Sequence, residues 1–260
     1  MLKQDSLQSV LNDACELVKQ CARGKDRVIA VSPEVADMLS RVQRCTASKP
    51  APLPTPVQPA FTFSRGRIPS EIQDLDTLEQ YVSQCDACPL AATRTRIVFG
   101  SGNPHAKLVF VGEAPGAEED RQGKPFVGRA GQLLTDIIEK GMKLKRSEVY
   151  ICNVLKCRPP ENRNPLPSEI AECEPYLIRQ LEIIRPKAIC ALGTYAAQTL
   201  LKTTETIGRL RGRWHFYHGI PLRATYHPAY LLRNPADKRK TWDDVLEVLK
   251  VYNGEFTPSP

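Results

Sequence analysis

The stretch KLVFVGEAPGAEEDRQGKPFVGRAGQLLTDIIEKG, residues 107–141, joins a short apolar run to an amphipathic segment through a loop rich in glycine and charge. A short apolar run that ends at a turn is typical of a buried strand, whereas the apolar spacing after residue 128 is typical of a helix. The loop between them is too polar for a core, and its glycines allow the backbone to bend sharply. The stretch predicts a strand, a ligand-holding loop and a helix in succession.

The same alternation continues along the chain. Further strands are expected at 149–155 (VYICNVL), 187–193 (KAICALG) and 222–227 (LRATYH), with helices at 167–186 and 194–202. Alternating strands and helices favour a mainly parallel sheet that is covered on both faces. We therefore predict an α/β fold, a three-layer α/β/α domain around a central, mainly parallel, four-stranded sheet.

Polar or bendable residues lie at or just past the ends of these strands. They are Gly112 with its loop, Asn153 with Cys157, and His227. In open parallel sheets, ligands bind beyond the carboxyl ends of the strands. We expect these residues to converge on one cleft.

Composition divides the chain into four parts. Residues 1–48 carry an apolar stripe at helical spacing and predict an N-terminal helical extension. Residues 49–70 are expected to form a linker, because KPAPLPTPVQPAFTF holds five prolines, too many for a packed helix or a central strand. The α/β domain is expected at 71–253, and 254–260 form a C-terminal tail.

Bulk properties indicate a globular protein with one sizeable core, since 42% of the 260 residues are hydrophobic and 25% are charged. We expect neither a membrane span nor a secretion signal, because no run of 18 apolar residues and no signal-peptide pattern is present, and we expect a cytoplasmic location. The net charge is +7, and Lys202 to Lys240 hold nine Lys or Arg against two acids. This excess permits an anionic partner, although solvated surfaces often carry it too.

Four of the nine cysteines are spaced as ligands. Cys85 and Cys88 form a CxxC pair, while Cys157 and Cys173 begin and end CRPPENRNPLPSEIAEC. Four thiolates suit an iron–sulfur cluster or a structural zinc ion, and spacing does not choose between them; four unrelated buried thiols are the alternative. The other five are expected to be ordinary core or surface thiols: Cys15, Cys21, Cys45, Cys152 and Cys190.

The loop after the first strand is suited to a neutral ligand. It lacks the glycine motifs that bind nucleotide phosphates, and four acids in it would repel phosphate: Glu113, Glu118, Glu119 and Asp120. Gly112 and Gly116 let the backbone approach a ligand closely. A flat neutral ligand stacked on Phe126 fits better, with simple core packing as the alternative for this ring.

The segment YHPAYLLRNP places His227 at a predicted strand end, directly before Pro228. Leu231 and Leu232 follow as an apolar pair beside Arg233. Such a pair can wedge into a base stack while arginines meet phosphates. A structural role is the more common explanation for a lone histidine.

Several of these motifs, in this order, closely resemble the family 4 uracil-DNA glycosylases, bacterial and archaeal repair enzymes that hold a [4Fe-4S] cluster. The motifs are GEAPGAEED, PFVG, NVLKCRPPENRNP, the four cysteines and HPAYLLRNP, and the resemblance spans roughly residues 75–251. It implies a uracil-DNA glycosylase-like domain that flips uracil out of single- or double-stranded DNA. Hydrolysis of the glycosidic bond would release free uracil and leave an abasic site, the first step of base excision repair.

The resemblance also implies residue roles. The ligands of a structural cluster, or of zinc as the alternative, would be Cys85, Cys88, Cys157 and Cys173. Phe126 would stack on uracil, Asn153 would read its Watson–Crick edge and His227 would contact a uracil oxygen. The substrate pocket would comprise Gly112, Ala114, Gly116, Phe126, Asn153 and His227. The catalytic groups would be Glu113, Glu119, Asn153 and His227, and the DNA contacts would be Leu231 and Arg233.

One departure from the better-known uracil glycosylases concerns the water. Their aspartate falls where this sequence has Ala114, so Glu113, Glu119 or Asn153 must orient it, and the sequence does not rank the three. No basic insert ending in histidine follows CRPP, so the covalent uracil-trapping variant of the superfamily has no support.

Two other functions compete with uracil excision. One is a nucleic-acid-binding module stabilised by zinc or a cluster, without catalysis, and the other is an iron–sulfur redox protein. Residues 1–48 are expected to be a plain helical extension or a contact for a polymerase or sliding clamp. We expect a monomer.

Overall fold

The structure, a computed structural model, describes residue 33, residues 63–64 and residues 68–259. Contacts divide the chain into two units, residues 1–57 and 58–260, and the account below concerns the second. Apart from Pro33, which is helical, the predicted N-terminal extension lies outside the described residues. Most of the predicted linker also lies outside them, so these two predictions stay predictions.

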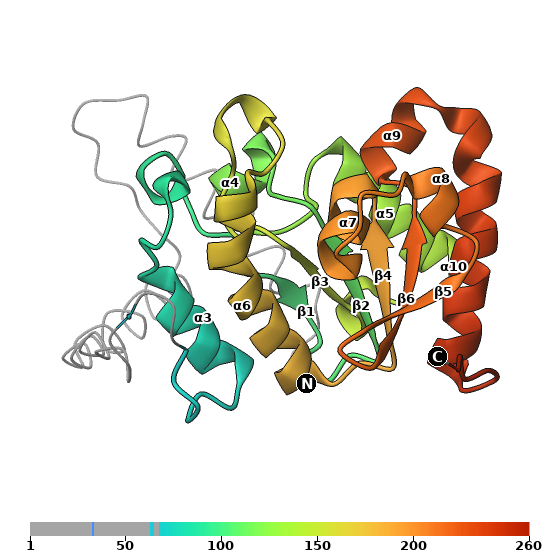
Figure 1. The fold of residues 1–260 in the computed structure, drawn as a ribbon, viewed down its shortest axis with the longest axis horizontal. Helices are drawn as coiled ribbons and strands as arrows, with labels where there is room; N and C mark the ends of the chain where they lie inside the picture. Colours follow the sequence, from blue (N-terminus) through green and yellow to red (C-terminus); the bar gives the residue numbers. More distant parts are fainter. Residues whose placement is uncertain (1–32, 34–62, 65–67, 260) are drawn as a thin grey trace. The chain divides into compact units, whose positions relative to one another are not determined.

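A six-stranded sheet forms the centre of the domain, in the order β1-β3-β2-β4-β6-β5 (Figure 1). The strands are β1 (Ser101–Gly102), β2 (Leu108–Gly112), β3 (Tyr150–Asn153), β4 (Ala188–Leu192), β5 (Trp214–Tyr217) and β6 (Ile220–Thr225). The four predicted strands are confirmed as β2, β3, β4 and β6, and they pair in parallel. Long apolar runs suit them because parallel strands are buried on both faces.

The prediction of four strands is incomplete, because β1 and β5 extend the sheet as antiparallel edges. β1 has only two residues, too few for a pattern. β5 and β6 form a hairpin through His218 and Gly219, whose φ angles of 47° and 79° are those of a tight primed turn. The aromatic run WHFY directly before His218 and Gly219 is typical of the first strand of a hairpin, although it lies outside the βα repeats.

Helices connect and cover the strands. The α-helices are α3 (Leu75–Ser83), α4 (Ala117–Gln122), α5 (Arg129–Asp136), α6 (Pro167–Ile184), α7 (Thr194–Leu201), α8 (Ile207–Leu210), α9 (Pro228–Arg233) and α10 (Lys238–Asn253). A π-turn, η2 (Ile137–Gly141), extends α5, and short 3-10 turns occur at η1 (Pro89–Ala92), η3 (Arg146–Glu148), η4 (Pro160–Asn162) and η5 (Pro235–Asp237). Among the described residues, no helix combines the length and apolar character needed to cross a bilayer.

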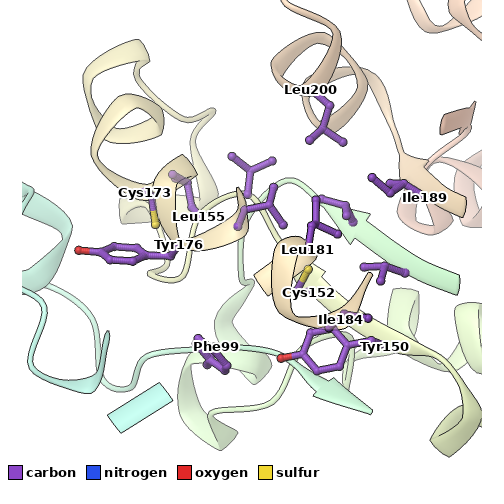
Figure 2. Close-up of a cluster of buried hydrophobic side chains, with 14 of the residues drawn as sticks. Phe99, Tyr150, Cys152, Leu155, Cys173, Tyr176, Leu181, Ile184, Ile189 and Leu200 are labelled. Atoms are coloured by element: carbon purple, nitrogen blue, oxygen red, sulfur yellow. The ribbon is translucent and has the colours of Figure 1, made fainter. Parts of the chain in front are cut away.

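Two hydrophobic cores lie on opposite faces of the sheet, which confirms the three-layer prediction. Successive β2 side chains point to opposite faces. Phe110 packs in the core that includes α5 and α10, whereas Val111 packs in the core that includes α3, α6 and α7. Figure 2 shows part of this second core, where Cys152 and Ile189 from the strands meet Leu181 from α6 and Leu200 from α7.

Because the four central strands are parallel, their carboxyl ends share one edge of the sheet. β2 and β3 end side by side, at Gly112 and Asn153. β4 ends at Leu192 and is followed by Gly193, whose φ of 93° favours glycine and whose added Cβ atom would lie 2.8 Å from Cβ of His227. The fold therefore brings three separated segments of the sequence to one place.

Candidate active site

The packing around Gly112 gathers the predicted base-binding residues. A Cβ atom added at Gly112 would lie 2.3 Å from Asn153 Oδ1 and 2.6 Å from the ring of Phe126. The Phe126 ring lies 5.6 Å from the ring of His227, measured between centroids. The structure thus assembles Gly112, Asn153, Phe126 and His227 at the carboxyl edge of the sheet, where the strand ends led us to expect them.

Phe126 has an unusual backbone. Its φ is 52°, a left-handed conformation that is rare for a bulky residue and costs free energy unless its surroundings enforce it. Arg146 Nη2 donates to the carbonyl oxygens of Pro125, at 2.9 Å, and Phe126, at 3.1 Å. A Cβ atom at Gly131 would lie 1.9 Å from the Phe126 carbonyl oxygen, so glycine is required there. The ring is held in place by its backbone as well as by core packing.

Asn153 is buried, with 1% of its surface exposed, and its Oδ1 atom has no hydrogen-bond partner among the described residues. An unpaired buried acceptor costs free energy, so native structures rarely leave one without a purpose. Asn153 Oδ1 lies beside Gly112, next to the Phe126 ring. The arrangement leaves a hydrogen-bond acceptor ready for a donor on a flat ligand.

His227 is the N-cap of α9, and its Nδ1 atom accepts a hydrogen bond from the Ala229 amide at 3.1 Å. A neutral imidazole that accepts at Nδ1 carries its proton on Nε2. Burial, together with the positive charge of Arg233, lowers the pKa of His227 to about 4. At neutral pH, His227 is therefore an uncharged donor through Nε2.

The two candidate carboxylates differ in their surroundings. Glu119 Oε1 accepts from the amides of Val127, at 2.9 Å, and Gly128, at 3.0 Å, so this side chain braces the segment that follows Phe126. The Glu113 carboxylate makes no hydrogen bond or ion pair with another described residue, and burial raises its pKa to about 7. The structure therefore distinguishes Glu119, which is hydrogen-bonded to backbone amides, from Glu113, whose carboxylate is free of such bonds. The sequence alone does not distinguish them.

The remaining pocket positions lie in the same loop. Gly116 is the N-cap of α4, where an added Cβ atom would lie 2.8 Å from Glu119 Oε2. Ala114 is half-buried and packs against the core on the α6 side of the sheet.

The two leucines of the predicted DNA wedge differ in exposure. Leu231 is only 1% exposed, because it lies on the inner face of α9, whereas 38% of Leu232 is exposed. Arg233 is exposed at the end of the same helix. The sequence identifies an apolar pair but not its helical phase, and the DNA contacts of Leu231 and Arg233 stay predictions.

The four predicted ligand cysteines line one small cavity, separate from the Phe126 group. Arg94 Nη1 donates to Cys157 Sγ at 3.5 Å, and the Lys156 amide donates to Cys173 Sγ at 3.2 Å. Burial raises the pKa of Cys157 to about 11 and that of Cys173 to about 12. Cys157 therefore does not join the base-binding group, contrary to the expectation of one cleft.

Two residues of these sites were missed from the sequence. Arg146 reaches Phe126 from a 3-10 turn twenty residues later, and Lys156 has a buried side chain next to a predicted ligand. Both act on backbone carbonyl groups, and such contacts leave no local sequence pattern. The only sequence feature that points to Lys156 is its charge, which interrupts the mainly apolar run NVLKC at residues 153–157.

Comparison with known proteins agrees with this geometry. The model of the Uracil DNA glycosylase superfamily matches residues 99–250. The type-4 uracil-DNA glycosylase of Thermotoga maritima is 45% identical over 166 residues, which cover 63% of this chain and 86% of that protein. The type-4 enzyme of Saccharolobus solfataricus is 43% identical over 192 residues, covering 71% of this chain and 89% of the relative.

A third relative, the type-4 uracil-DNA glycosylase of Archaeoglobus fulgidus, is 45% identical over 174 residues, with 63% of this chain and 86% of the relative covered. The matched segment contains the sheet, the Phe126 group and two of the four cysteines of the cavity, Cys157 and Cys173. The three-layer fold, the residues at its carboxyl edge and these relatives agree. The chain belongs to the type-4 uracil-DNA glycosylases of the uracil-DNA glycosylase superfamily.

Proposed function

We propose that this protein excises uracil from DNA by hydrolysing the N-glycosidic bond, which releases free uracil and leaves an abasic site for base excision repair. The observation that carries the proposal is the buried, unpaired Asn153 Oδ1 atom beside the rings of Phe126 and His227. A base inside a duplex is out of reach of such a group, so the nucleotide must be flipped out of the stack.

Base selection follows from hydrogen-bond complementarity. Uracil presents an N3–H donor, which Asn153 Oδ1 can accept, and the Phe126 ring offers a flat surface for stacking. Cytosine has an acceptor at N3, so it would face Asn153 Oδ1 with two unpaired acceptors. A buried unpaired acceptor costs about 1–3 kcal/mol, enough to discriminate between the bases.

His227 is placed to stabilise the leaving base. As the glycosidic bond lengthens, positive charge grows on the sugar and negative charge grows on uracil O2. The Nε2–H donor of His227 gains strength as that oxygen becomes anionic, so it stabilises the transition state more than the substrate. No proton transfer from an imidazolium is needed, because His227 is neutral above about pH 4.

Glu113 is our candidate for orienting the water. Its carboxylate has no partner among the described residues, while Glu119 is engaged with backbone amides. An ionised Glu113 would also stabilise the positive charge that develops on the sugar. Glu119 then acts by fixing the loop that presents Phe126.

DNA contact is assigned to the outer face of α9. Leu232 takes the wedge role in place of the buried Leu231, and Arg233 meets a phosphate. A DNA substrate also favours the expected cytoplasmic location. A monomeric state and a polymerase or clamp contact through residues 1–48 stay predictions.

We further propose that Cys85, Cys88, Cys157 and Cys173 hold a structural [4Fe-4S] cluster. They surround one cavity, and N–H groups of Arg94 and Lys156 donate to two of the sulfurs, as is common around iron–sulfur clusters. Zinc is the alternative, because four thiolates also suit a tetrahedral structural zinc site. When bound, the cluster would tie α6 to the segments around Cys85 and Cys157.

The test of function uses the purified, full-length protein and an oligonucleotide with one uracil. Free uracil and alkali-labile abasic sites should appear together, while matched strands with cytosine or thymine stay intact. Iron and zinc are quantified in the same preparation. A folded, iron-containing protein that binds the oligonucleotide and releases no uracil would favour the non-catalytic binding module.

The dependence of kcat/KM on pH should follow the ionisation of the Glu113 carboxyl group. Because burial raises the pKa of Glu113 to about 7 and the carboxylate is the active form, kcat/KM should rise between about pH 6 and about pH 8 and then level off. His227 adds no inflection in this range. The Glu113→Gln variant should be slower and lack the inflection. A wild-type profile that is flat across this range would argue against the role of Glu113.

Arg146→Met should lower kcat/KM by about 10- to 100-fold, because it frees the strained Phe126 backbone, and misplacing a binding group by about 1 Å costs on that order. Arg179→Met is the matched control, since Arg179 also donates to two carbonyl oxygens, of Ser70 and Ile72, on the outer side of α6. It should lower the melting temperature and spare activity. Equal losses of activity in both variants would contradict the assignment.

A further inference from the structure

Lys156 is a buried cation that the proposed reaction does not use. Only 1% of its surface is exposed, and it lies between the base-reading Asn153 and the cavity-lining Cys157. Burying an ammonium group is costly unless it is paired and hydrogen-bonded, and a core of this kind would accept Met or Leu at lower cost. Its position therefore needs an explanation.

The Lys156 ammonium group is anchored on both sides. Nζ donates to the Asn153 carbonyl oxygen at 2.7 Å and to Gln180 Oε1 at 2.6 Å. Gln180, on α6, is itself fixed, because its Nε2 donates to the Phe99 carbonyl at 3.0 Å and to the Tyr150 hydroxyl at 3.2 Å. Figure 2 shows Phe99 and Tyr150 in the core on this face of the sheet. The backbone of Asn153 is thus tied to α6 through one lysine.

The same residue also reaches the cysteine cavity. Its backbone amide donates to Cys173 Sγ at 3.2 Å, and Lys156 lines the cavity together with the four cysteines. Among the described residues, no carboxylate forms an ion pair with the ammonium; burial lowers the pKa of Lys156, and the neighbouring sulfur groups of Cys152, Cys173 and Cys157 act in the opposite direction. Thiolates that bind a cluster would supply the missing negative charge.

We propose that Lys156 is a positioning residue that couples the cysteine cavity to base recognition: its amide and charge hold the cluster thiolates while its ammonium group fixes the Asn153 backbone. This inference rests on the proposed function and on the proposed cluster. It gives the cluster a defined effect on the uracil site without any redox role. Because coupling between two sites is reciprocal, uracil binding must also stabilise the cluster.

Three quantities are to be measured on the holoprotein: the inhibition constant for free uracil, the rate of iron loss to a chelator, and the melting temperature. Lys156→Met, similar in size but without charge or donors, should weaken uracil inhibition and speed iron loss, each by about 10- to 100-fold, as is typical when a group that orients metal ligands is lost. Lys156→Arg should restore part of both. Wild-type values of both quantities in a folded Lys156→Met protein would overturn the proposal.

Arg223→Met is the matched control, because Arg223 is another buried cation of the domain and pairs with Asp244 instead of sulfur. It should lower the melting temperature and leave uracil inhibition and iron retention unchanged. A merely structural Lys156 would behave in the same way as Arg223. If Arg223→Met changed all three quantities as Lys156→Met does, the coupling would be refuted.

A second measurement needs no variant and covers the case in which Lys156→Met does not fold. Saturating free uracil should slow chelator-driven iron loss from the wild-type holoprotein, and an equal concentration of cytosine should not. Unchanged iron loss with bound uracil would overturn the coupling. Uracil release from DNA by the same preparation is measured first: its absence refutes the proposed function, whereas an active protein without this linkage refutes the Lys156 proposal alone.

Discussion

Gly112→Ala is expected to lower kcat/KM for uracil excision by about 100-fold or more, the cost of misplacing catalytic groups by about 1 Å. The added methyl group would lie 2.3 Å from Asn153 Oδ1 and 2.6 Å from the Phe126 ring, so it meets the base-reading group and the stacking surface at once. These steric clashes can be removed only if the Asn153 side chain or the Phe126 ring moves. Single-turnover rates on a uracil oligonucleotide, with melting temperatures, measure the effect.

The matched control is Gly208→Ala. Gly208 lies in α8, and a Cβ atom added there meets nothing within 4 Å. Alanine also has the higher helix propensity, so this variant should keep full activity and equal or higher stability. Near-normal excision by a folded Gly112→Ala protein would show that the close packing at the end of β2 is not part of the uracil site.

His227→Ala is expected to lower the rate of the chemical step by about 10²- to 10³-fold, the usual cost of removing one donor to a developing oxyanion. The loss should appear in kcat more than in KM, because the donor acts mainly on the charge that grows on uracil O2. His105→Ala, in an exposed turn, is the control and should be active.

The pH dependence of this deficit separates two mechanisms. Because the pKa of His227 is about 4, the imidazole stays neutral, and the ratio of wild-type to variant rates should be constant between about pH 6 and about pH 9. An imidazolium donor would instead lose activity as pH rises through its own pKa. A ratio that falls with rising pH in this range would contradict a neutral His227.

The four parallel strands and the gathering of the site were predictable from the sequence because both follow from local patterns and one topological rule. Apolar runs such as KLVFVG identified the parallel strands, and parallel strands end at one edge. The resemblance then selected Phe126, Asn153 and His227 from the residues near that edge. The edge strand β1 was not predictable, since two residues carry no period.

The remaining features depend on side-chain direction or on contacts distant in sequence. Leu231 and Leu232 are the same residue type at adjacent positions, and only the orientation of α9 determines which one is buried. Glu113 and Glu119 are likewise the same residue type, and they differ because the Val127 and Gly128 amides donate hydrogen bonds to Glu119. Tertiary contacts of this kind do not produce a periodic pattern of apolar and polar residues, so they cannot be predicted from the local sequence.

The central claim is that Gly112, Phe126, Asn153 and His227 enclose one flat pyrimidine. A crystal structure of the holoprotein with free uracil tests it most directly. Uracil should stack on the Phe126 ring, with N3–H donating to Asn153 Oδ1 and O2 accepting from His227 Nε2. Uracil bound at another place, or bound here with N3–H turned away from Asn153, would contradict the account.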